Sequence, residues 1–266
     1  MVEDKKKVEN KEEKKLGKFK MKIKSNILQT VIDSIAVIHN ETLFEFKKTK
    51  IETTQVDPAH VAMVNMALER DACEEYDSTG IELGIDLDKM KDVLKLAKSD
   101  SIVELLFDEK EEFNRMLVKI GHINRRIGIL DKEGFTIPKI PDTNYMTMVK
   151  LFAGEMNLML KASEQVSDHI HIDTDKEKFE VWAEGDIDDV HVPIPKAELM
   201  ELKVPGNETT KSMYSIDVFE SLLKTAGSST ELLMEYNSDN PVHLKYDFAD
   251  GKGKLSYTLA PRIESE

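Results

Sequence analysis

The sequence predicts an α+β protein of two similar domains, each with two helices packed on antiparallel β-sheet. An internal repeat predicts the two similar halves, and apolar residues at a spacing of two over much of the remaining chain predict strands. The chain has 266 residues, of which 40% are hydrophobic, so its length is sufficient for two domains that each bury a core.

The repeat places Leu94 on Leu223, an offset of 223 − 94 = 129, and extends over residues 89–105 of the first copy. Each copy starts at a candidate helix-capping residue, Asp86 or Ser215. An amphipathic helix, a polar turn and a strand follow in both copies.

A second strand–helix unit comes earlier in each half. A strand at residues 19–24 precedes a helix at 26–39, and a strand at 145–150 precedes a helix at about 153–162. Period-two patterns and β-branched runs predict further strands at 42–46, 60–68, 116–120, 127–130, 178–182, 190–194, 243–248 and 254–259.

Two segments differ from the rest in composition. Residues 1–18 hold seven Lys and five Asp or Glu, so we expect a disordered charged tail, whose lysines could alternatively reach DNA phosphates. Residues 131–145 contain two prolines, which exclude a helix, but are too apolar for a free linker. We interpret them as an extended connector between domains at 19–130 and 146–266, either packed down or available to a partner peptide.

The charge and cysteine content exclude several classes of protein. With 37 basic and 51 acidic residues the net charge is −14, and without the first 18 residues it is 30 − 46 = −16, which excludes a uniformly basic surface. The single Cys73 excludes a disulfide framework. No apolar stretch approaches the roughly 18–20 residues that span a bilayer, and the start lacks the apolar core of a signal peptide. We expect a cytosolic or nuclear protein without membrane contact.

Catalytic motifs have little support. The sequence contains no GxGxxG, GxxxxGK[ST] or GxSxG motif. Alternation places His169, His171 and Asp173 on one face of a strand as a possible metal triad, but the same pattern is typical of an ordinary strand, and no other His/Cys cluster supplies a fourth ligand. We expect no metal and no other cofactor.

Lysines concentrate near the predicted helices. Lys91, Lys95 and Lys98 have the spacing i, i+4, i+7 of one helical stripe, and Lys89 lies on the other flank. Lys224 is the repeat equivalent of Lys95, and Lys161 lies on the first helix of the second half. These lysines form either a local positive surface or an ordinary solvated face, because Asp88 and Asp92 lie among them.

The C-terminal segment, LSYTLAPRIE at residues 255–264, resembles the ending of the DNA sliding clamps of archaea and eukaryotes, the proliferating cell nuclear antigen family. Residues 55–64, with Asp57 and His60 three apart before a strand, are also similar to the family. So are the helix at 87–98, the connector end at 140–145 and the hairpin at 240–250. The resemblance covers about residues 19–266.

This resemblance implies a DNA clamp fold in which three subunits join head to tail into a six-domain ring, with interface strands at 122–130 and 187–194. The ring would be non-catalytic, would encircle double-stranded DNA without reading its sequence, and would tether DNA polymerase, the clamp loader and other proteins that carry short clamp-binding peptides.

The resemblance also implies two sets of site residues. The DNA-facing set is Lys24, Lys89, Lys91, Lys95, Lys98, Lys161 and Lys224, and the partner-binding set is Val56, His60, Val61, Ile137, Ile140, Pro141, Pro241 and Ala260. The first helix departs from the family because it has no Lys or Arg, which shifts part of the DNA contact to Lys24, Arg125, Arg126 or the tail.

Two alternatives stay open at the level of sequence. The chain could be one subunit of a heterotrimeric ring, or a metal-dependent hydrolase that uses the His169, His171 and Asp173 triad. The lysine-rich start and the short ending favour an archaeal, cytoplasmic clamp over a eukaryotic, nuclear one.

Overall fold

The computed structural model describes residues 18–110, 114–139 and 143–263, and the two halves contain the same order of elements, as the repeat predicts. The N-terminal half comprises β1 (Lys18–Lys24), α1 (Ser25–Ala36), β2 (Glu41–Phe46), β3 (Lys50–Val56), β4 (Ala62–Glu69), β5 (Glu75–Ser78), β6 (Ile81–Asp86), α2 (Leu87–Leu94), β7 (Ile102–Asp108), β8 (Arg115–Ile120) and β9 (Ile123–Gly128). The C-terminal half comprises β10 (Thr147–Phe152), α3 (Ala153–Glu164), β11 (His169–Thr174), β12 (Lys178–Glu184), β13 (Asp189–Pro195), β14 (Glu201–Lys203), β15 (Thr210–Ser215), α4 (Ile216–Leu223), β16 (Glu231–Tyr236), β17 (Val242–Phe248) and β18 (Gly253–Leu259).

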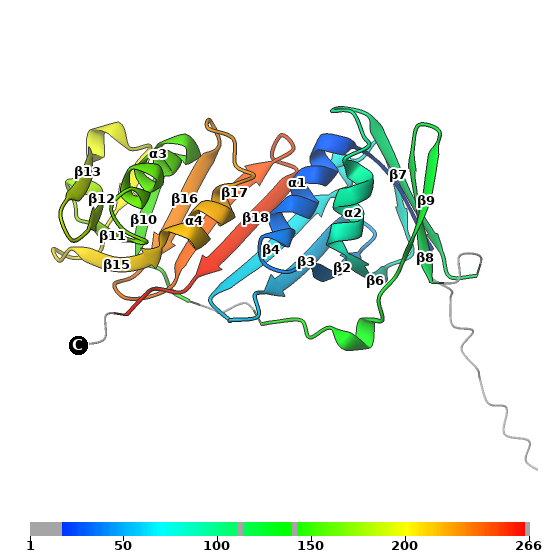
Figure 1. Ribbon diagram of the computed structural model, residues 1–266, viewed down its shortest axis with the longest axis horizontal. Helices are drawn as coiled ribbons and strands as arrows, with labels where there is room; N and C mark the ends of the chain where they lie inside the picture. Colours follow the sequence, from blue (N-terminus) through cyan, green and yellow to red (C-terminus); the bar gives the residue numbers. More distant parts are fainter. Residues whose placement is uncertain (1–17, 111–113, 140–142, 264–266) are drawn as a thin grey trace, which may run out of the picture.

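One nine-stranded antiparallel sheet runs through both halves, in the order β14-β10-β16-β17-β18-β4-β3-β2-β6. The halves meet where β18 pairs with β4. All four helices of the described chain lie on the same side of this sheet, in a row α3, α4, α1, α2 (Figure 1). The helices therefore form one continuous face of the molecule.

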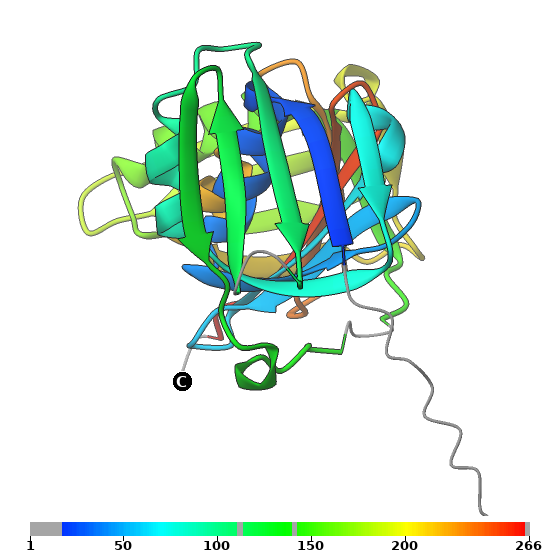
Figure 2. The ribbon, with the colours of Figure 1, turned by 90° about the vertical axis from the view of Figure 1, so that its right-hand side faces the viewer.

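A smaller sheet closes each end of the molecule. The order is β5-β1-β7-β8-β9 at the N-terminal end and β13-β12-β11-β15 at the C-terminal end. Figure 2 views the first of these sheets face-on, with β9 and β5 as its two outer strands. β9 and β13 contain most of the residues that the sequence analysis assigns to subunit interfaces.

The nine-stranded sheet repeats the order of the two smaller sheets strand for strand. Replacing each strand by its repeat equivalent converts β14-β10-β16-β17-β18 into β5-β1-β7-β8-β9, and β4-β3-β2-β6 into β13-β12-β11-β15. The β18–β4 junction inside the chain therefore corresponds to β9 and β13, which are outer strands of separate sheets.

Apolar side chains from the helices and from both kinds of sheet form the core. On α1, Leu28, Val31, Ile32 and Ile35 are buried, as the helical spacing predicts. Tyr257 on β18 is also buried, and its Oη donates a hydrogen bond of 2.9 Å to the Ser34 carbonyl in the last turn of α1. The two halves thus share one core.

One helix ends earlier than predicted, and one of the two predicted caps is not formed. α1 ends at Ala36 rather than His39, because the Ile38 and His39 N–H groups both donate to the Ile35 carbonyl and close a turn. Asp86 caps α2 as predicted, its side chain accepting from the Lys89 N–H at 3.0 Å. Ser215 makes no such bond, and the first N–H of α4, that of Ile216, instead donates to the Asp168 carbonyl.

Some strands were not predicted, among them β3, β5, β6, β14 and β15. On β3 the reason is a buried polar residue, since the Thr53 hydroxyl is hydrogen-bonded to Thr42 at 2.6 Å and to the Leu43 carbonyl. Lys18, which the sequence analysis assigns to the tail, is the first residue of β1, and Lys18 Nζ lies 2.6 Å from Asp108. The remaining tail, residues 1–17, lies outside the described residues.

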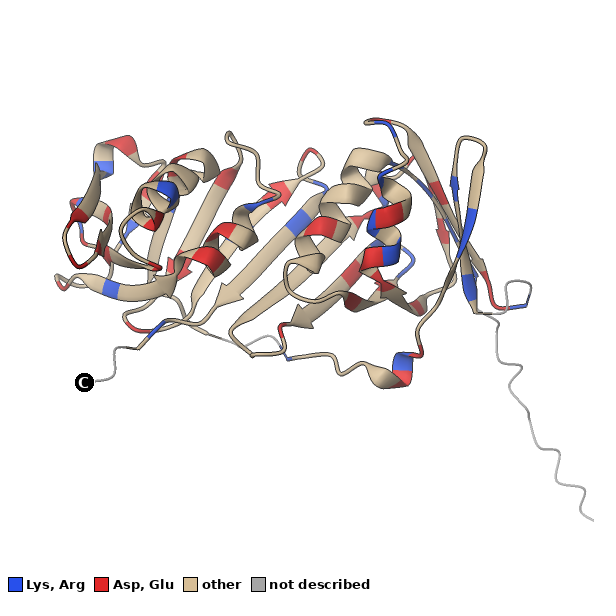
Figure 3. Ribbon diagram, viewed as in Figure 1, with Lys and Arg blue, Asp and Glu red and all other residues tan. Residues whose placement is uncertain are grey.

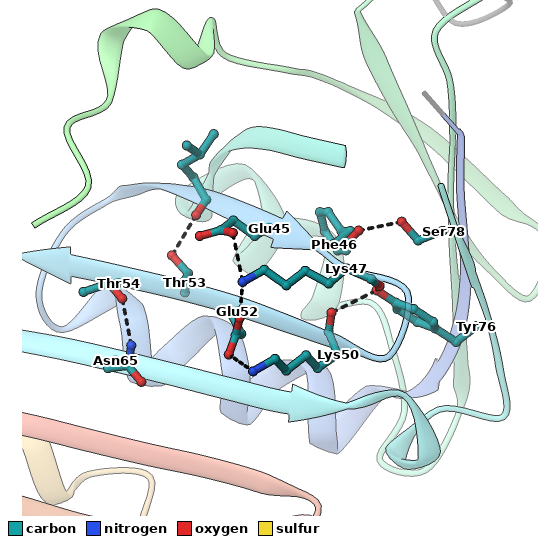
Figure 4. A network of polar contacts seen from close by, with 11 residues as sticks. Glu45, Phe46, Lys47, Lys50, Glu52, Thr53, Thr54, Asn65, Tyr76 and Ser78 are labelled. Carbon is teal, nitrogen blue, oxygen red and sulfur yellow. Dashed lines mark hydrogen bonds and ion pairs between the residues drawn. The ribbon is translucent and has the colours of Figure 1, made fainter. Parts of the chain in front are cut away.

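The β2–β3 hairpin places Glu45 directly opposite Glu52. Like charges in such a pair destabilise a sheet unless they are neutralised. Lys47 Nζ lies 3.1 Å from Glu45 and 2.5 Å from Glu52, and Lys50 contacts Glu52 from the other side (Figure 4). The ion pairs keep both carboxylates compatible with the ladder.

After β9, the described connector residues 131–139 run along the lower border of the molecule in Figure 1. The start of the connector is packed down: the Leu130 N–H donates to the Gly84 carbonyl at 2.8 Å, and a short 3-10 helix, η2 (Lys132–Gly134), follows. Phe135 then lies against Gly84, where a Cβ atom would come within 2.7 Å of its ring.

Candidate functional site

Only three of the seven predicted DNA-facing lysines lie within helices: Lys89 and Lys91 on α2 and Lys161 on α3. Lys24 is the residue before α1, and Lys95 and Lys224 directly follow α2 and α4. Lys98 lies in the turn beyond α2, so the predicted stripe is shorter than its spacing suggested.

The turn after α2 is fixed by the start of α1. The Ser25 hydroxyl donates to the Lys98 carbonyl at 2.7 Å, and the Ser25 N–H donates to the Ser101 carbonyl at 2.8 Å. These bonds hold residues 98–101 of the turn against the start of α1, and β7 follows at Ile102.

Three lysines of the α2 region, Lys89, Lys91 and Lys95, each have an acidic partner three residues earlier. Lys89 Nζ lies 2.9 Å from Asp86, and Lys95 Nζ lies 2.9 Å from Asp92. Lys91 Nζ lies 3.9 Å from Asp88. The hydrogen bond from Lys95 lowers the pKa of Asp92, so this carboxylate stays ionised beside its lysine. α2 therefore presents balanced charges rather than a positive stripe.

The helical face as a whole carries more acids than bases. α1 has one acid and no base, α2 has two of each, α3 has two acids and one lysine, and α4 has two acids, which gives 3 − 7 = −4. Figure 3 shows acidic bands on every helix, alternating with basic ones on α2. The smaller sheet at the N-terminal end carries two further basic residues, Arg125 and Arg126, on β9.

A groove of about 320 Å³ lies between the turn after β3 and the first part of the connector. Its lining includes Val56 and His60 from the predicted partner-binding set, and Leu130 and Phe135 from the connector. Ile137 follows on the connector and is 51% exposed.

Three further residues of the predicted set meet at one end of the central sheet. Val242 pairs with Leu259, and Leu259 with Ala62, so the chain positions beyond these pairs adjoin as well. They are Pro241, Ala260 and Val61, and the Ala260 N–H donates to the Val61 carbonyl at 2.8 Å. Val61 is 39% exposed. Ile140 and Pro141 lie outside the described residues.

Asp57 shapes the wall of this groove. Its carboxylate accepts hydrogen bonds from the N–H groups of Ala59, Val61 and Ala62 at 2.6–3.0 Å. The resulting turn holds His60 at φ +57°, a left-handed conformation that costs free energy in a residue with a side chain. The side chain of Asp57 thus positions His60 and Val61 at the groove.

The sequence analysis missed some groove residues, including His39, Gln55 and Phe135 as lining side chains. His39 and Gln55 carry no local signal, because only the pairing of β2 with β3 brings them together. Phe135 was recognisable as an apolar residue in a proline-containing segment. The i−3 spacing of each acid from its lysine was visible in the sequence and predicts their pairing.

The possible metal triad is engaged in other contacts. The His171 ring stacks on Trp182 with centroids 3.8 Å apart, Asp173 lies 3.2 Å from Lys211 Nζ, and His169 Nδ1 lies 2.6 Å from Asp168. In the part of the chain that the structure describes, no group of three or more His, Cys, Asp or Glu side chains is arranged to hold a metal ion. The hydrolase hypothesis is therefore not favoured.

Comparison with known families agrees with this architecture. The model of the proliferating cell nuclear antigen N-terminal domain matches residues 18–127, and that of the C-terminal domain matches residues 139–262. The chain belongs to the proliferating cell nuclear antigen family. Among residues 18–110, 114–139 and 143–263, no helix is long and apolar enough to cross a membrane.

Archaeal members of this family are similar over nearly the whole chain. The DNA polymerase sliding clamp of Natronomonas pharaonis is 31% identical over 251 residues, which is 93% of this chain and all of the relative. The DNA polymerase sliding clamp of Methanocella arvoryzae is 32% identical over 249 residues, with the same coverage of both chains.

Solved structures of the family have the same fold. The proliferating cell nuclear antigen of A. fulgidus, solved with the C-terminal region of FEN-1 bound, matches with a TM-score of 0.87 and 30% identity over 93% of this chain and all of that one. The homologue from Thermococcus kodakaraensis matches with a TM-score of 0.83 at 24% identity over 92% of this chain.

Proposed function

We propose that the protein is a DNA sliding clamp, a non-catalytic ring of three copies that encircles duplex DNA and tethers DNA polymerase and other proteins to it. Each copy contributes two domains, residues 19–130 and 146–266, joined by the connector at 131–145. Membership of the family and the names of the archaeal relatives support this function.

The observation that carries the proposal is the match between the central sheet and the two end sheets. β18 and β4 pair inside the chain, whereas their equivalents β9 and β13 end separate sheets. An outer strand with unpaired backbone groups is a template for another chain. Pairing β9 of one copy with β13 of the next would complete a second nine-stranded sheet, and a head-to-tail contact of this kind closes into a ring.

The helical face then lines the hole of the ring. Lys24, Lys89, Lys91, Lys95, Lys98, Lys161 and Lys224 meet the DNA phosphates there, without base contacts. Counted together with the four flanking lysines of this set, the helices carry no net charge, 7 − 7 = 0, so this interaction is weak, and closure of the ring rather than affinity holds the clamp on DNA.

The groove beneath the connector takes the clamp-binding peptides of partner proteins. Its sheet side presents Val56 and His60, and its connector side presents Leu130 and Phe135. Exposed Val61, which the Ala260 N–H contacts, and exposed Ile137 follow these residues along the chain. Apolar anchors of a short helical turn fit such a groove. The related A. fulgidus protein, solved with a C-terminal region of FEN-1, supports peptide binding in the family. The full partner-binding set also includes Ile140, Pro141 and Pro241.

The mass of the assembly and its retention on circular but not on linear DNA test the proposed function. The purified protein should sediment with three times the 30.3 kDa of one chain. After loading by an archaeal clamp loader it should stay on nicked circular DNA through a gel-filtration column, and it should be lost once a restriction enzyme linearises the circle. Equal retention on linear DNA would exclude an encircling ring.

The same measurements separate the homotrimer from a heterotrimer. A chain that needs different partners would sediment as a monomer or dimer when expressed alone. The archaeal sources of the relatives support a cytoplasmic location.

A further inference from the structure

The internal junction between β18 and β4 fixes the register in which two copies can pair. The first strand of the seam is β9, whose position follows from residues that lie directly opposite one another on neighbouring strands. Across β1, β7, β8 and β9 these residues are Met21, Leu105, Val118 and Arg125. The equivalent residues across β10, β16, β17 and β18 are Val149, Met234, Leu244 and Tyr257. Leu105 and Met234 are aligned by the repeat, at the offset 234 − 105 = 129, so Arg125 occupies the place of Tyr257.

The position of β13, the second strand of the seam, follows in the same way from β4. The residues that lie directly opposite one another across β6, β2, β3 and β4 are Ile81, Phe46, Ile51 and Leu68. Across β15, β11, β12 and β13 they are Thr210, Thr174, Phe179 and Ile194. Ile81 and Thr210 again differ by 210 − 81 = 129, so Ile194 occupies the place of Leu68. Four residues earlier, Val190 therefore occupies the place of Val64.

Val64 pairs with Tyr257 and Met63 with Thr258 at the internal junction. If β9 of one copy pairs with β13 of the next in the register of β18 and β4, Arg125 lies opposite Val190 and Arg126 lies opposite Asp189. This step rests on the proposed ring. We infer that Arg126 of one copy lies directly opposite Asp189 of the next, in a ladder that also pairs Asn124 with His191 and Ile123 with Val192.

Burial supports this register. At the internal junction the inward residues of both strands, among them Leu255, Leu259 and Met66, are fully buried. At the outer strands the equivalent Ile123 is 41% exposed, and Val192, which the ladder places opposite it, is only partly buried. A second copy in the inferred register covers these apolar side chains.

Charge also supports this register. β9 carries Arg125 and Arg126, and the chain entering β13 carries Asp186, Asp188 and Asp189. The ladder puts Arg126 on the outward face with Asp189, and Arg125 on the inward face diagonal to Asp188. Opposite charges in such positions stabilise a pair of strands, whereas like charges destabilise it.

The prolines of β13 agree with the same alignment. In β4 the Glu69 N–H donates across the junction to the Lys252 carbonyl, so odd-numbered N–H groups of β4 point toward β18. The equivalent odd-numbered positions of β13 are Asp189, His191, Pro193 and Pro195. Prolines occur in strands where the missing N–H would face an open edge. On the β13 side, the backbone donors of the intersubunit ladder are therefore those of Asp189 and His191, and β9 supplies the others.

Disulfide trapping tests the register in the full-length protein. Asn124→Cys combined with His191→Cys should form a disulfide-linked trimer on mild oxidation, because directly opposite Cα atoms lie within disulfide reach. The matched control, Asn124→Cys with Pro193→Cys, shifts the pair by two residues on the same face. Burial raises the pKa of the native Cys73 thiol to about 12, so it competes little.

Charge exchange tests the pair itself. Arg126→Glu or Asp189→Arg alone should raise the midpoint concentration of trimer dissociation by roughly tenfold or more. The double variant should recover wild-type assembly. Stronger linkage in the shifted cysteine control, or no recovery in the double variant, would overturn the inferred register. A wild-type chain that does not assemble would instead contradict the proposed ring.

Discussion

Tyr257 joins the last strand of the chain to its first helix through one buried hydrogen bond to the Ser34 carbonyl. Tyr257→Phe removes the donor and leaves that carbonyl unpaired inside the core. We expect the free energy of unfolding to fall by about 1–3 kcal/mol, measured by urea denaturation. An unchanged midpoint would show that the carbonyl has another donor.

His243 on β17 gives a pH dependence with a definite sign. Burial lowers its pKa below the usual 6.5, nearby Lys245 lowers it further, and Glu235 partly opposes them. The unfolded chain then binds more protons than the folded one just below pH 6.5, so stability is present above this pH and is lost on acidification toward the folded-state pKa.

His243→Gln should flatten this part of the stability profile, because glutamine keeps a polar partner for Ser256 without titrating. Urea midpoints measured between about pH 5 and pH 8 check it. A profile with the same slope in the variant would assign the effect to other groups.

At the scale of elements, the packing of the connector on β6 depends on Gly84. A Cβ atom there would lie 2.7 Å from the Phe135 ring and 2.8 Å from the Leu130 carbonyl oxygen. Gly84→Ala should displace the connector, weaken peptide binding in a fluorescence titration, and lower the free energy of unfolding by about 1–3 kcal/mol.

Gly134→Ala is the matched control for this change. It also adds a methyl group to the connector, but nothing lies within 4 Å of the added atom. A wild-type free energy of unfolding is expected for this variant, and stability is the control measurement because Gly134 itself lines the groove. If Gly84→Ala bound peptide as well as the wild type, the start of the connector would not shape the groove.

The charges of α2 allow a pair of opposite predictions. Lys91→Ala with Lys95→Ala should weaken DNA retention and reduce the slope of log affinity against log salt by about 0.9 for each DNA phosphate that the variant no longer neutralises. Asp88→Asn with Asp92→Asn frees the same lysines and should strengthen retention. Both are measured by salt titration of binding to DNA, with the trimer mass as control. Changes in the same direction would mean that α2 does not face DNA.

Element positions were more predictable from sequence than the site. Period and repeat predict both helix pairs, because burial of one face imposes the spacing of residues such as Val31 and Ile35. The position of the turn after α2 was not predictable, since its Lys98 carbonyl is held by the Ser25 hydroxyl, 73 residues away. The groove was predicted through family resemblance alone: Val61, Pro241 and Ala260 meet only through the register of β4, β18 and β17.

At the scale of the whole molecule, assembly should depend on the few backbone donors of β13. His191→Pro removes an N–H that faces the next copy and should produce monomers in sedimentation analysis. Pro193→Ala restores a donor on the same side and should slow subunit exchange. A stable trimer in His191→Pro, or faster exchange in Pro193→Ala, would contradict the orientation of β13.

In the proposed ring, the β18–β4 junction within a chain and the β9–β13 junction between chains differ in how readily they reform after a transient break. β18 and β4 belong to one chain, so their effective concentration is high and a transient break recloses at once. β9 and β13 belong to different molecules, and the second is shortened as a donor strand by Pro193 and Pro195. Of six similar seams, three are tethered and three are not. In the proposed ring, we therefore expect opening for DNA entry to occur at a β9–β13 seam, where Pro193 and Pro195 leave fewer backbone hydrogen bonds to break.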